Sequence, residues 1–184
     1  IEDMKQQYGE DSSTFAIRVK GEFPTDSADS LISRHLVESA VSRDVEPMTV
    51  APIWGLDPAR FGGDRTAIAK RQGNVLIEPI KSWQGKDLME TVGIVLAEYE
   101  ACQYLDRPSE ICVDSIGIGA GVVDRLRELG LPARGVNVAE SPSLGNRYQR
   151  LRDELWFKTR EWFEARDCKI PDQDELISEL SSLK

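Results

Sequence analysis

Strand-like and helix-like segments follow one another in this chain in an order that few folds can accommodate. Residues 50–57 form an apolar run of strand length, and two further runs, 66–71 and 75–80, flank the turn sequence Gln72-Gly73-Asn74. Strand-forming runs around a short glycine-containing turn are typical of a β-hairpin. The sequence therefore predicts three consecutive antiparallel strands.

After these strands, helical and strand patterns alternate. Apolar spacing predicts a helix from Asp87, its N-cap, to about residue 105, then a strand at 110–114 and a helix to about residue 129. A short strand at 133–138 follows.

Two more helices are expected near the end, at about 147–166 and 174–183. The first would bury Leu151, Leu155, Trp162 and Phe163. A meander followed by alternating helices and strands predicts an α/β protein with a mixed sheet and helices on both faces. This order resembles that of the ribonuclease-H-like fold.

The chain changes character near residue 46. Residues 1–46 are polar and rich in turns, with one helical candidate at about 29–43, and Pro47 then interrupts the chain. We interpret residues 1–46 as a linker or the end of a preceding module. Residues 47–184 are expected to form the main domain.

Composition restricts the chemistry that this domain can perform. The 184 residues include three cysteines without a CxxC pair and one histidine, His35. Zinc binding, a disulfide framework and histidine-dependent nucleophilic catalysis are therefore unexpected, and a reducing cytoplasm suits the chain. No run approaches the roughly 20 apolar residues of a membrane span. Any catalysis must depend on carboxylates.

Charge alone argues against nucleic acid as a partner. The net charge is −9, whereas phosphate binding favours Lys and Arg. However, residues 1–50 carry −5 of this charge. Bound divalent cations would offset part of the remainder.

Two aspartates each end a predicted strand. Asp57 closes the run at 50–57, and Asp114 closes the run at 110–114. If the two strands are neighbours, both carboxylates lie at one sheet edge, where ligands bind in open α/β sheets. Oxygen ligands of this kind suit Mg²⁺ or Mn²⁺. Each aspartate alone could equally start a turn.

Other residues near these aspartates have weaker signals. Asp64 either belongs to the turn Gly62-Gly63-Asp64 or supports the metal from outside its ligand shell. Arg60 and Arg65 flank the same loop and are candidates for DNA backbone contacts. Gly117 and Gly119 could allow DNA phosphate, or the sheet itself, to approach the start of the next helix. Their spacing is neither GxGxxG nor a P-loop.

Four stretches of the chain together resemble the C-terminal nuclease domain of phage terminase large subunits. They are Val19-Lys20-Gly21-Glu22-Phe23-Pro24, Gly55-Leu56-Asp57-Pro58-Ala59 with Gly62-Gly63-Asp64-Arg65-Thr66-Ala67, Val113-Asp114-Ser115-Ile116-Gly117-Ile118-Gly119-Ala120-Gly121, and Arg150-Leu151-Arg152-Asp153-Glu154-Leu155-Trp156. The resemblance covers nearly the whole chain and rests on the order and spacing of these motifs.

The resemblance implies an endonuclease that cuts double-stranded DNA with two Mg²⁺ or Mn²⁺ ions during viral genome packaging. It implies that Asp57 and Asp114 are the first two metal-binding acids. A third acid of the family is expected beyond residue 184. It also implies a terminase small subunit and a portal as partners, residues 1–46 as the end of an ATPase module, and work in the host cytoplasm at the procapsid.

Two other functions remain open from the sequence. An actin- or sugar-kinase-like nucleotide-binding module shares this strand order and would place a phosphate loop at Gly117–Gly121. A non-catalytic docking domain of the packaging motor is the third possibility. ATP binding would distinguish the nucleotide-binding module from a nuclease. The docking domain predicts no thermal shift with either ATP or Mn²⁺.

Overall fold

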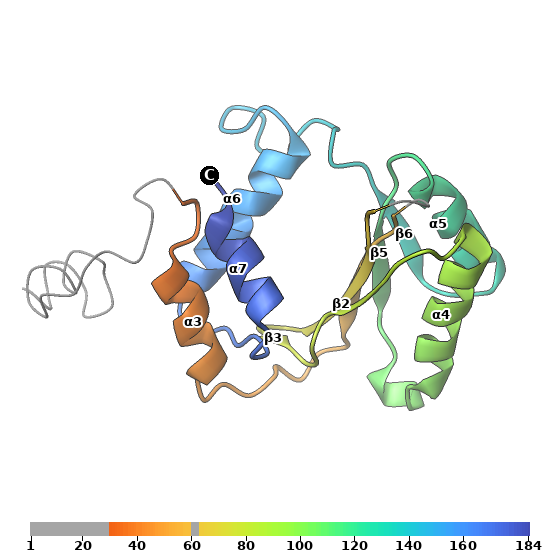
Figure 1. The fold of residues 1–184 in the computed structure, drawn as a ribbon, viewed down its shortest axis with the longest axis horizontal. Coiled ribbons are helices and arrows are strands. Elements are labelled where there is room, and N and C mark those ends of the chain that lie inside the picture. Colours follow the sequence, from red (N-terminus) through yellow and green to blue (C-terminus); the bar gives the residue numbers. More distant parts are fainter. Residues whose placement is uncertain (1–29, 60–62) are drawn as a thin grey trace, which may run out of the picture. The chain divides into compact units, whose positions relative to one another are not determined.

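The computed structural model describes residues 30–59 and 63–184. In chain order its elements are α3 (Arg34–Ser42), β1 (Ile53–Asp57), β2 (Thr66–Gln72), β3 (Val75–Leu76), β4 (Lys81–Trp83), α4 (Leu88–Ala101), the 3₁₀ turn η2 (Tyr104–Asp106), β5 (Glu110–Asp114), α5 (Gly119–Glu128), β6 (Ala133–Val136), α6 (Leu151–Glu164) and α7 (Asp174–Ser182). From residue 87 onward, the predicted succession of helices and strands is confirmed, and Figure 1 shows these elements.

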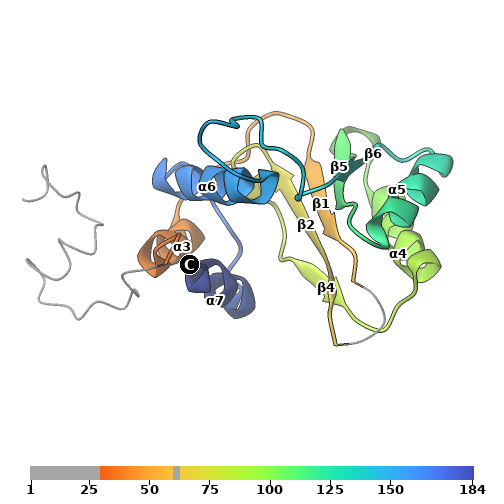
Figure 2. The same ribbon diagram turned by 90° about the horizontal axis from the view of Figure 1, so that it is seen from above.

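The strands form one mixed sheet in the order β3-β2-β1-β5-β6, with β4 also paired to β2. β1 and β2 are antiparallel, whereas β1–β5 and β5–β6 are parallel pairs. The predicted hairpin turn is present, with Gly73 at a φ of 57°. Figure 2 shows β1 between β2 and β5, so the first strand of the meander is central in the sheet.

The third predicted strand, 75–80, is wrong as a single element. Only Val75 and Leu76 pair with the end of β2, and the chain returns as β4 to pair with the beginning of β2. Pro79 lies in the gap and has no N–H to donate to a sheet ladder. The meander therefore contains four strands.

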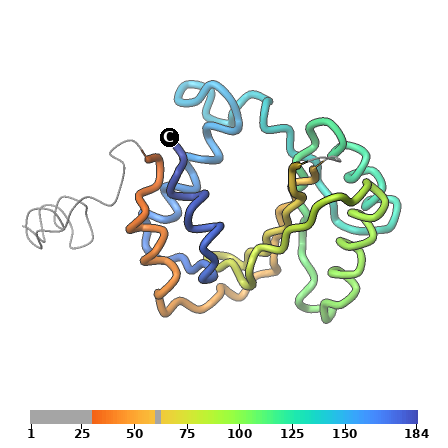
Figure 3. Tube along the Cα trace, viewed as in Figure 1, coloured from red at the N-terminus to blue at the C-terminus, as the bar shows by residue number. Residues whose placement is uncertain are grey.

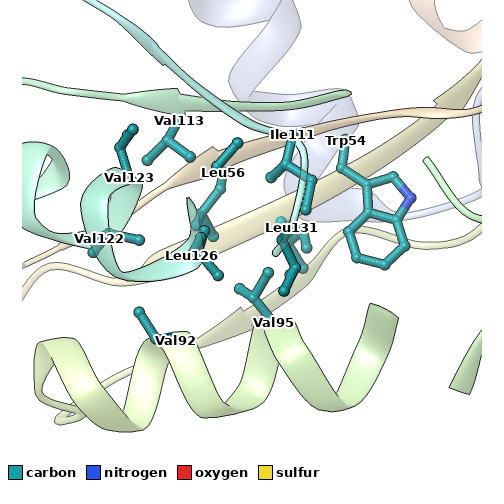
Figure 4. Close-up of a cluster of buried hydrophobic side chains, with 12 residues drawn as sticks. Trp54, Leu56, Val92, Val95, Ile111, Val113, Val122, Val123, Leu126 and Leu131 are labelled. Carbon is teal, nitrogen blue, oxygen red and sulfur yellow. The ribbon is translucent and has the colours of Figure 1, made fainter. Parts of the chain in front are cut away.

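Helices α4 and α5 pack against one face of the sheet and enclose the main core. Trp54, Leu56, Ile111 and Val113 point from the strands toward Val92, Val95, Val122 and Leu126 of the two helices (Figure 4). Alternate strand residues supply this core, as a sheet with one covered face requires. Burial of these side chains fixes the register of β1 and β5.

Helix α4 begins as the sequence predicts and ends earlier. Asp87 accepts a hydrogen bond from the Glu90 N–H at 2.7 Å, and the Glu90 carboxylate accepts one from the Asp87 N–H at 3.0 Å. This capping box satisfies N–H groups that a helix start leaves unpaired. The helix stops at Ala101, four residues before the expected end, and η2 follows as a separate turn.

The chain divides into two compact units. Among the described residues, those from 46 to 156 form the unit that contains the sheet, and 30–45 together with 157–184 form the second unit. The sheet-containing unit starts at residue 46, whereas the sequence-based interpretation starts the main domain at residue 47, and residues 157–184 group with described residues before 46. Within the second unit, α3 and α7 lie side by side although they are far apart in sequence (Figure 3).

The second unit has its own core. The Leu31 N–H donates to the Leu183 carbonyl at 2.7 Å, and the Ile170 N–H donates to the Ala40 carbonyl at 3.2 Å. Among its described residues, the buried apolar side chains are Ile32, Val37, Ala40, Phe163, Cys168, Ile170 and Ile177. In α6, Phe163 is buried as predicted, but Leu155 is exposed, so the expected burial of Leu155 is wrong.

Candidate metal centre

Asp57 and Asp114 lie side by side at the ends of neighbouring parallel strands. The pairing of β1 with β5 aligns Gly55 with Cys112 and Leu56 with Val113. Asp57 and Asp114 are the next residue on each strand, and neighbouring strands are about 4.8 Å apart. Side chains alternate along a strand, so both aspartates point away from the core face that holds Leu56 and Val113.

The electrostatics of the pair agree with this placement. The pKa of Asp57 is raised above its usual value by partial burial and by the negative charge of Asp114. Asp57 is nevertheless solvent-exposed and Asp114 half-buried, so both carboxylates remain accessible from solution. Two nearby like charges favour a bound cation that would relieve their repulsion.

The loop after Asp114 fixes this carboxylate. The Ile116 N–H donates a hydrogen bond to the Asp114 Oδ1 atom at 3.0 Å. Gly117 follows with a φ of 68°, a left-handed conformation that favours glycine, and α5 begins two residues later. One oxygen of Asp114 therefore anchors the loop that leads into α5.

The loop after Asp57 is held by a residue that the sequence analysis missed. The Ala59 N–H donates to the Thr66 Oγ1 atom at 3.0 Å, and Thr66 is buried. Thr66 begins β2. The next residue, Ala67, pairs with Asp57, so Thr66 lies next to the end of β1. A threonine at the start of a strand gives no sequence signal for this contact, which depends on strand register.

The remaining predicted site residues lie near the same loop or outside the described residues. Arg60 is outside them. Asp64 and Arg65 are exposed and directly precede β2, and the Gly63 carbonyl accepts a hydrogen bond from the Gln84 Nε2 atom at 2.7 Å. Asp64 is thus at the sheet edge that carries Asp57, in a position compatible with either role considered for it.

The two predicted glycines differ in their surroundings. A side chain at Gly117 would meet open space, whereas Gly119 is buried against the backbone of Asp114. Close approach of helix to strand, one of the two roles considered for these glycines, is therefore present at Gly119.

The donor set of the pair fits a hard divalent cation. Two carboxylates at a partly exposed strand edge supply oxygen ligands and leave room for water, as Mg²⁺ and Mn²⁺ require. Within residues 30–59 and 63–184, no third His, Cys, Asp or Glu joins them to make a three-ligand cluster. In the same residues, no helix has the length and apolar character of a membrane span.

Comparison with known proteins finds similar folds among solved structures. No protein-family model matches the chain, and no curated protein does. Among solved structures, the nuclease domain of the large terminase subunit gp2 of bacterial virus Sf6 superposes with a TM-score of 0.61 at 16% identity, covering 83% of this chain and 80% of that chain.

Two thermophilic phages provide further neighbours. The large terminase nuclease of phage G20c has a TM-score of 0.61 at 13% identity, with 83% and 80% of the two chains covered. The large terminase of another thermophilic bacteriophage has a TM-score of 0.56 at 12% identity, and the match covers 79% of this chain and 34% of that chain. The chain therefore has the ribonuclease-H-like fold of the nuclease domains of phage large terminase subunits.

Proposed function

We propose that this chain is the nuclease domain of a phage-type large terminase subunit and hydrolyses phosphodiester bonds of double-stranded DNA. The observation that carries the proposal is the placement of Asp57 beside Asp114 on parallel strands, within this fold. The raised pKa of Asp57, which Asp114 helps to cause, supports a shared ligand at this position.

The proposed cofactor is a pair of Mg²⁺ or Mn²⁺ ions. Asp57 would contribute to both ions, and Asp114 would contribute a carboxylate oxygen. Structures of terminase nucleases have been solved with manganese, with calcium and with zinc, which supports a divalent-metal site in this fold. Asp64 is proposed to support the site through water.

The residues of the chain would prepare the site for the chemistry. Bound divalent cations lower the pKa of an attacking water and stabilise charge on the leaving 3′ oxygen. Asp57 and Asp114 fix where these cations bind, and the hydrogen bonds from Ile116 and to Thr66 hold the two loops still. Preorganisation of this kind avoids a reorganisation cost during reaction.

DNA would be held through its backbone. Arg60 and Arg65 flank the metal loop and are proposed to contact phosphates, which positions a duplex without reading its sequence. Gly117, whose surroundings are open, would let phosphate approach the start of α5, where Gly119 is the first residue of the helix.

The biological setting follows from the same proposal. The chain would act on concatemeric DNA at a procapsid in the host cytoplasm, with the terminase small subunit and the portal as partners. Residues 1–46 would connect the nuclease to a preceding ATPase module, and residues 47–184 would belong to the nuclease domain.

A plasmid assay tests the proposal. The full-length protein is incubated with supercoiled plasmid in Mn²⁺, and Asp57→Ala and Asp114→Ala are expected to lower cutting at least about a hundredfold because each removes a proposed metal ligand. Asp124→Ala, an exposed acid on α5, is the matched control and is expected to cut like the unaltered chain. Equal cutting by all four proteins would show that the pair is not the active site.

Mn²⁺ binding provides a second test that does not depend on enzymatic turnover. The unaltered chain is expected to bind Mn²⁺, and both alanine variants of the pair are expected to lose this binding. Thermal stabilisation by Mg-ATP without any response to Mn²⁺ would instead favour a nucleotide-binding module.

A further inference from the structure

Gly119 occupies the point where the two acidic strand ends meet. It is the first residue of α5 and is buried. A β-carbon at this position would overlap the carbonyl oxygen of Asp114, and it would lie 2.8 Å from the carbonyl carbon of Asp114 and 3.4 Å from Cγ of Pro58. One position thus touches the backbone of one aspartate and the residue that follows the other.

The need for glycine here is steric and not conformational. Gly73, Gly85, Gly117 and Gly130 have positive φ angles, whereas Gly119 does not. An α-helix also favours alanine over glycine, by about 1 kcal/mol in its interior. Gly119 is therefore explained by the closeness of α5 to β5, since the helical backbone at this position would accept a side chain.

Neither neighbour of Gly119 can move aside easily. The Asp114 backbone lies within the β5–β6 ladder, where Asp114 pairs with Val136 and the next N–H, of Ser115, donates to the Val136 carbonyl at 3.0 Å. Pro58 is buried, its φ is fixed by its ring, and the following Ala59 is bonded to Thr66. A methyl group at position 119 would therefore displace backbone.

Gly121 provides a contrast in the same helix. A β-carbon there would lie 2.8 Å from Cδ1 of Leu88, the tip of a flexible side chain. Rotation of Leu88 can relieve this contact, because a leucine tip has alternative rotamers. The two glycines thus differ in what a methyl group would move: backbone next to the aspartates at position 119, and one side chain at position 121.

We propose that Gly119 is a positioning residue for the Asp57–Asp114 pair. Its missing side chain lets α5 close against β5 and Pro58, and this contact sets the separation of the two carboxylates. The inference rests on the proposed function, since the separation matters because both carboxylates share cations. Adding a methyl group at position 119 shifts Asp114 or the Asp57 loop and weakens cation binding.

The test compares Gly119→Ala with Gly121→Ala in the 184-residue chain. Mn²⁺ binding is followed by electron paramagnetic resonance at a temperature where thermal melts show each protein folded. Gly119→Ala is expected to bind Mn²⁺ about tenfold more weakly or worse, the usual effect of disturbing groups that orient metal ligands. Gly121→Ala is expected to stay within about twofold of the unaltered chain, because it disturbs no group that orients a metal ligand.

A second measurement needs no metal. The Ile116 N–H is bonded to the Asp114 Oδ1 atom, so its hydrogen exchange reports the position of this carboxylate. Exchange of Ile116 is expected to be faster in Gly119→Ala and unchanged in Gly121→Ala. If Gly119→Ala matches the unaltered chain in both Mn²⁺ affinity and Ile116 exchange, the inference is overturned and the proposed function stays intact.

The two proposals fail in different ways. If the unaltered chain binds no Mn²⁺ but Ile116 exchanges faster in Gly119→Ala, the metal function is wrong while the positioning of Asp114 stands. If Gly119→Ala does not fold, Pro58→Ala decides, because it removes the ring that faces Gly119 without adding volume. It is expected to weaken Mn²⁺ binding about threefold or more, and unaltered binding would overturn the inference.

Discussion

At the scale of single residues, the candidate site contains a repulsion between two carboxylates that a bound cation would relieve. The carboxylates of Asp57 and Asp114 are neighbours, and burial together with the Asp114 charge raises the pKa of Asp57 in the folded protein. A carboxyl group with a raised folded-state pKa binds its proton more tightly than in the unfolded chain. Its contribution to stability is present at low pH and is lost as pH rises through that pKa.

Asp114→Asn should therefore stabilise the metal-free protein at neutral pH. The substitution removes the charge that repels Asp57, so the melting temperature is expected to rise at about pH 7. The gain should shrink as pH falls toward about 4, because Asp57, whose pKa is raised, takes up a proton. Melting curves in EDTA across this pH range measure the change, with Asp124→Asn as the control.

Addition of Mn²⁺ should reverse the order of the two proteins in the same experiment. Only the unaltered chain keeps both ligands, and a ligand that binds the native state alone stabilises it. Lower stability of Asp114→Asn in EDTA at neutral pH would contradict the arrangement described for the pair.

Thr66→Val tests the support of the Asp57 loop. Valine preserves the shape of threonine but leaves the Ala59 N–H without its hydrogen bond, which is expected to cost about 1–2 kcal/mol of unfolding free energy. Urea denaturation measures the loss. Thr66→Ser keeps a hydroxyl group and should recover most of the stability and of the Mn²⁺ affinity, whereas equal losses in both variants would mean that the hydroxyl does not matter.

The sequence located the two candidate carboxylates better than the residues that support them. Asp57 and Asp114 could be placed together because each ends a run of strand-forming residues, a local pattern. The role of Thr66 depends on the register of β2 against β1, and the contact of Gly119 depends on how closely α5 packs on β5. Such through-space relations leave no periodic signal along the chain.

At the scale of elements, α4 is tied to the sheet by a charge network around one buried lysine. The Lys70 ammonium of β2 is bonded to Glu98 of α4 at 2.6 Å and to Glu78 at 2.8 Å, and it lies 4.4 Å from the ring centroid of Trp54. Lys81 of β4 reaches Glu98 at 2.7 Å. Because Lys70 is buried, its charge requires these partners.

Lys70→Met should loosen this attachment. The substitution keeps the length of the side chain and removes its charge. Losing one partner of a buried pair costs about 3–5 kcal/mol, and partial exposure of the two glutamates reduces the expected loss to about 2 kcal/mol. Chemical denaturation measures it, and Lys86→Met, which removes an exposed pair with Glu90, should cost less than about 1 kcal/mol.

The same network predicts a response to acid. Hydrogen bonds from Lys70 and Lys81 lower the pKa of Glu98 below its usual 4.5. The stability that Glu98 contributes is present above that usual value and is lost as pH falls through the lowered pKa. Between about pH 5 and about pH 2.5, the unfolding free energy should fall less steeply with pH in Lys70→Met than in the unaltered chain. An identical slope in the two proteins would show that the Lys70–Glu98 pair does not make stability depend on pH.

Element boundaries were predictable where a single residue determines them. Asp87 marked the start of α4, and Asp114 marked the end of β5. The run at 75–80 was misassigned because strand propensity counts its apolar residues, while Pro79 divides the pairing between β3 and β4. The burial of Leu155 was misassigned because helical periodicity predicts a shared face of α6 but not which of its residues other elements cover.

At the scale of the whole molecule, the two cores should respond separately to damage. Phe163→Ala empties a fully buried position in the second unit and should destabilise that unit by about 3–5 kcal/mol. Hydrogen exchange is expected to accelerate in α3 and α7 while β1, β2 and β5 keep their protection. Phe157→Ala, at an exposed position of the same helix, is the control, and uniform acceleration in all elements would mean one cooperative unit.

The pairing of β1 with β5 has a consequence for the timing of folding. Asp57 and Asp114 are 57 positions apart in the chain, so closing that segment into a parallel pair is a slow, non-local event. If Asp57 and Asp114 share cations as proposed, a newly made chain could not bind them at this site until β5 had joined β1. Mn²⁺ should accordingly slow unfolding while leaving the refolding rate almost unchanged, and the proposed nuclease would become active only after this strand pair had formed.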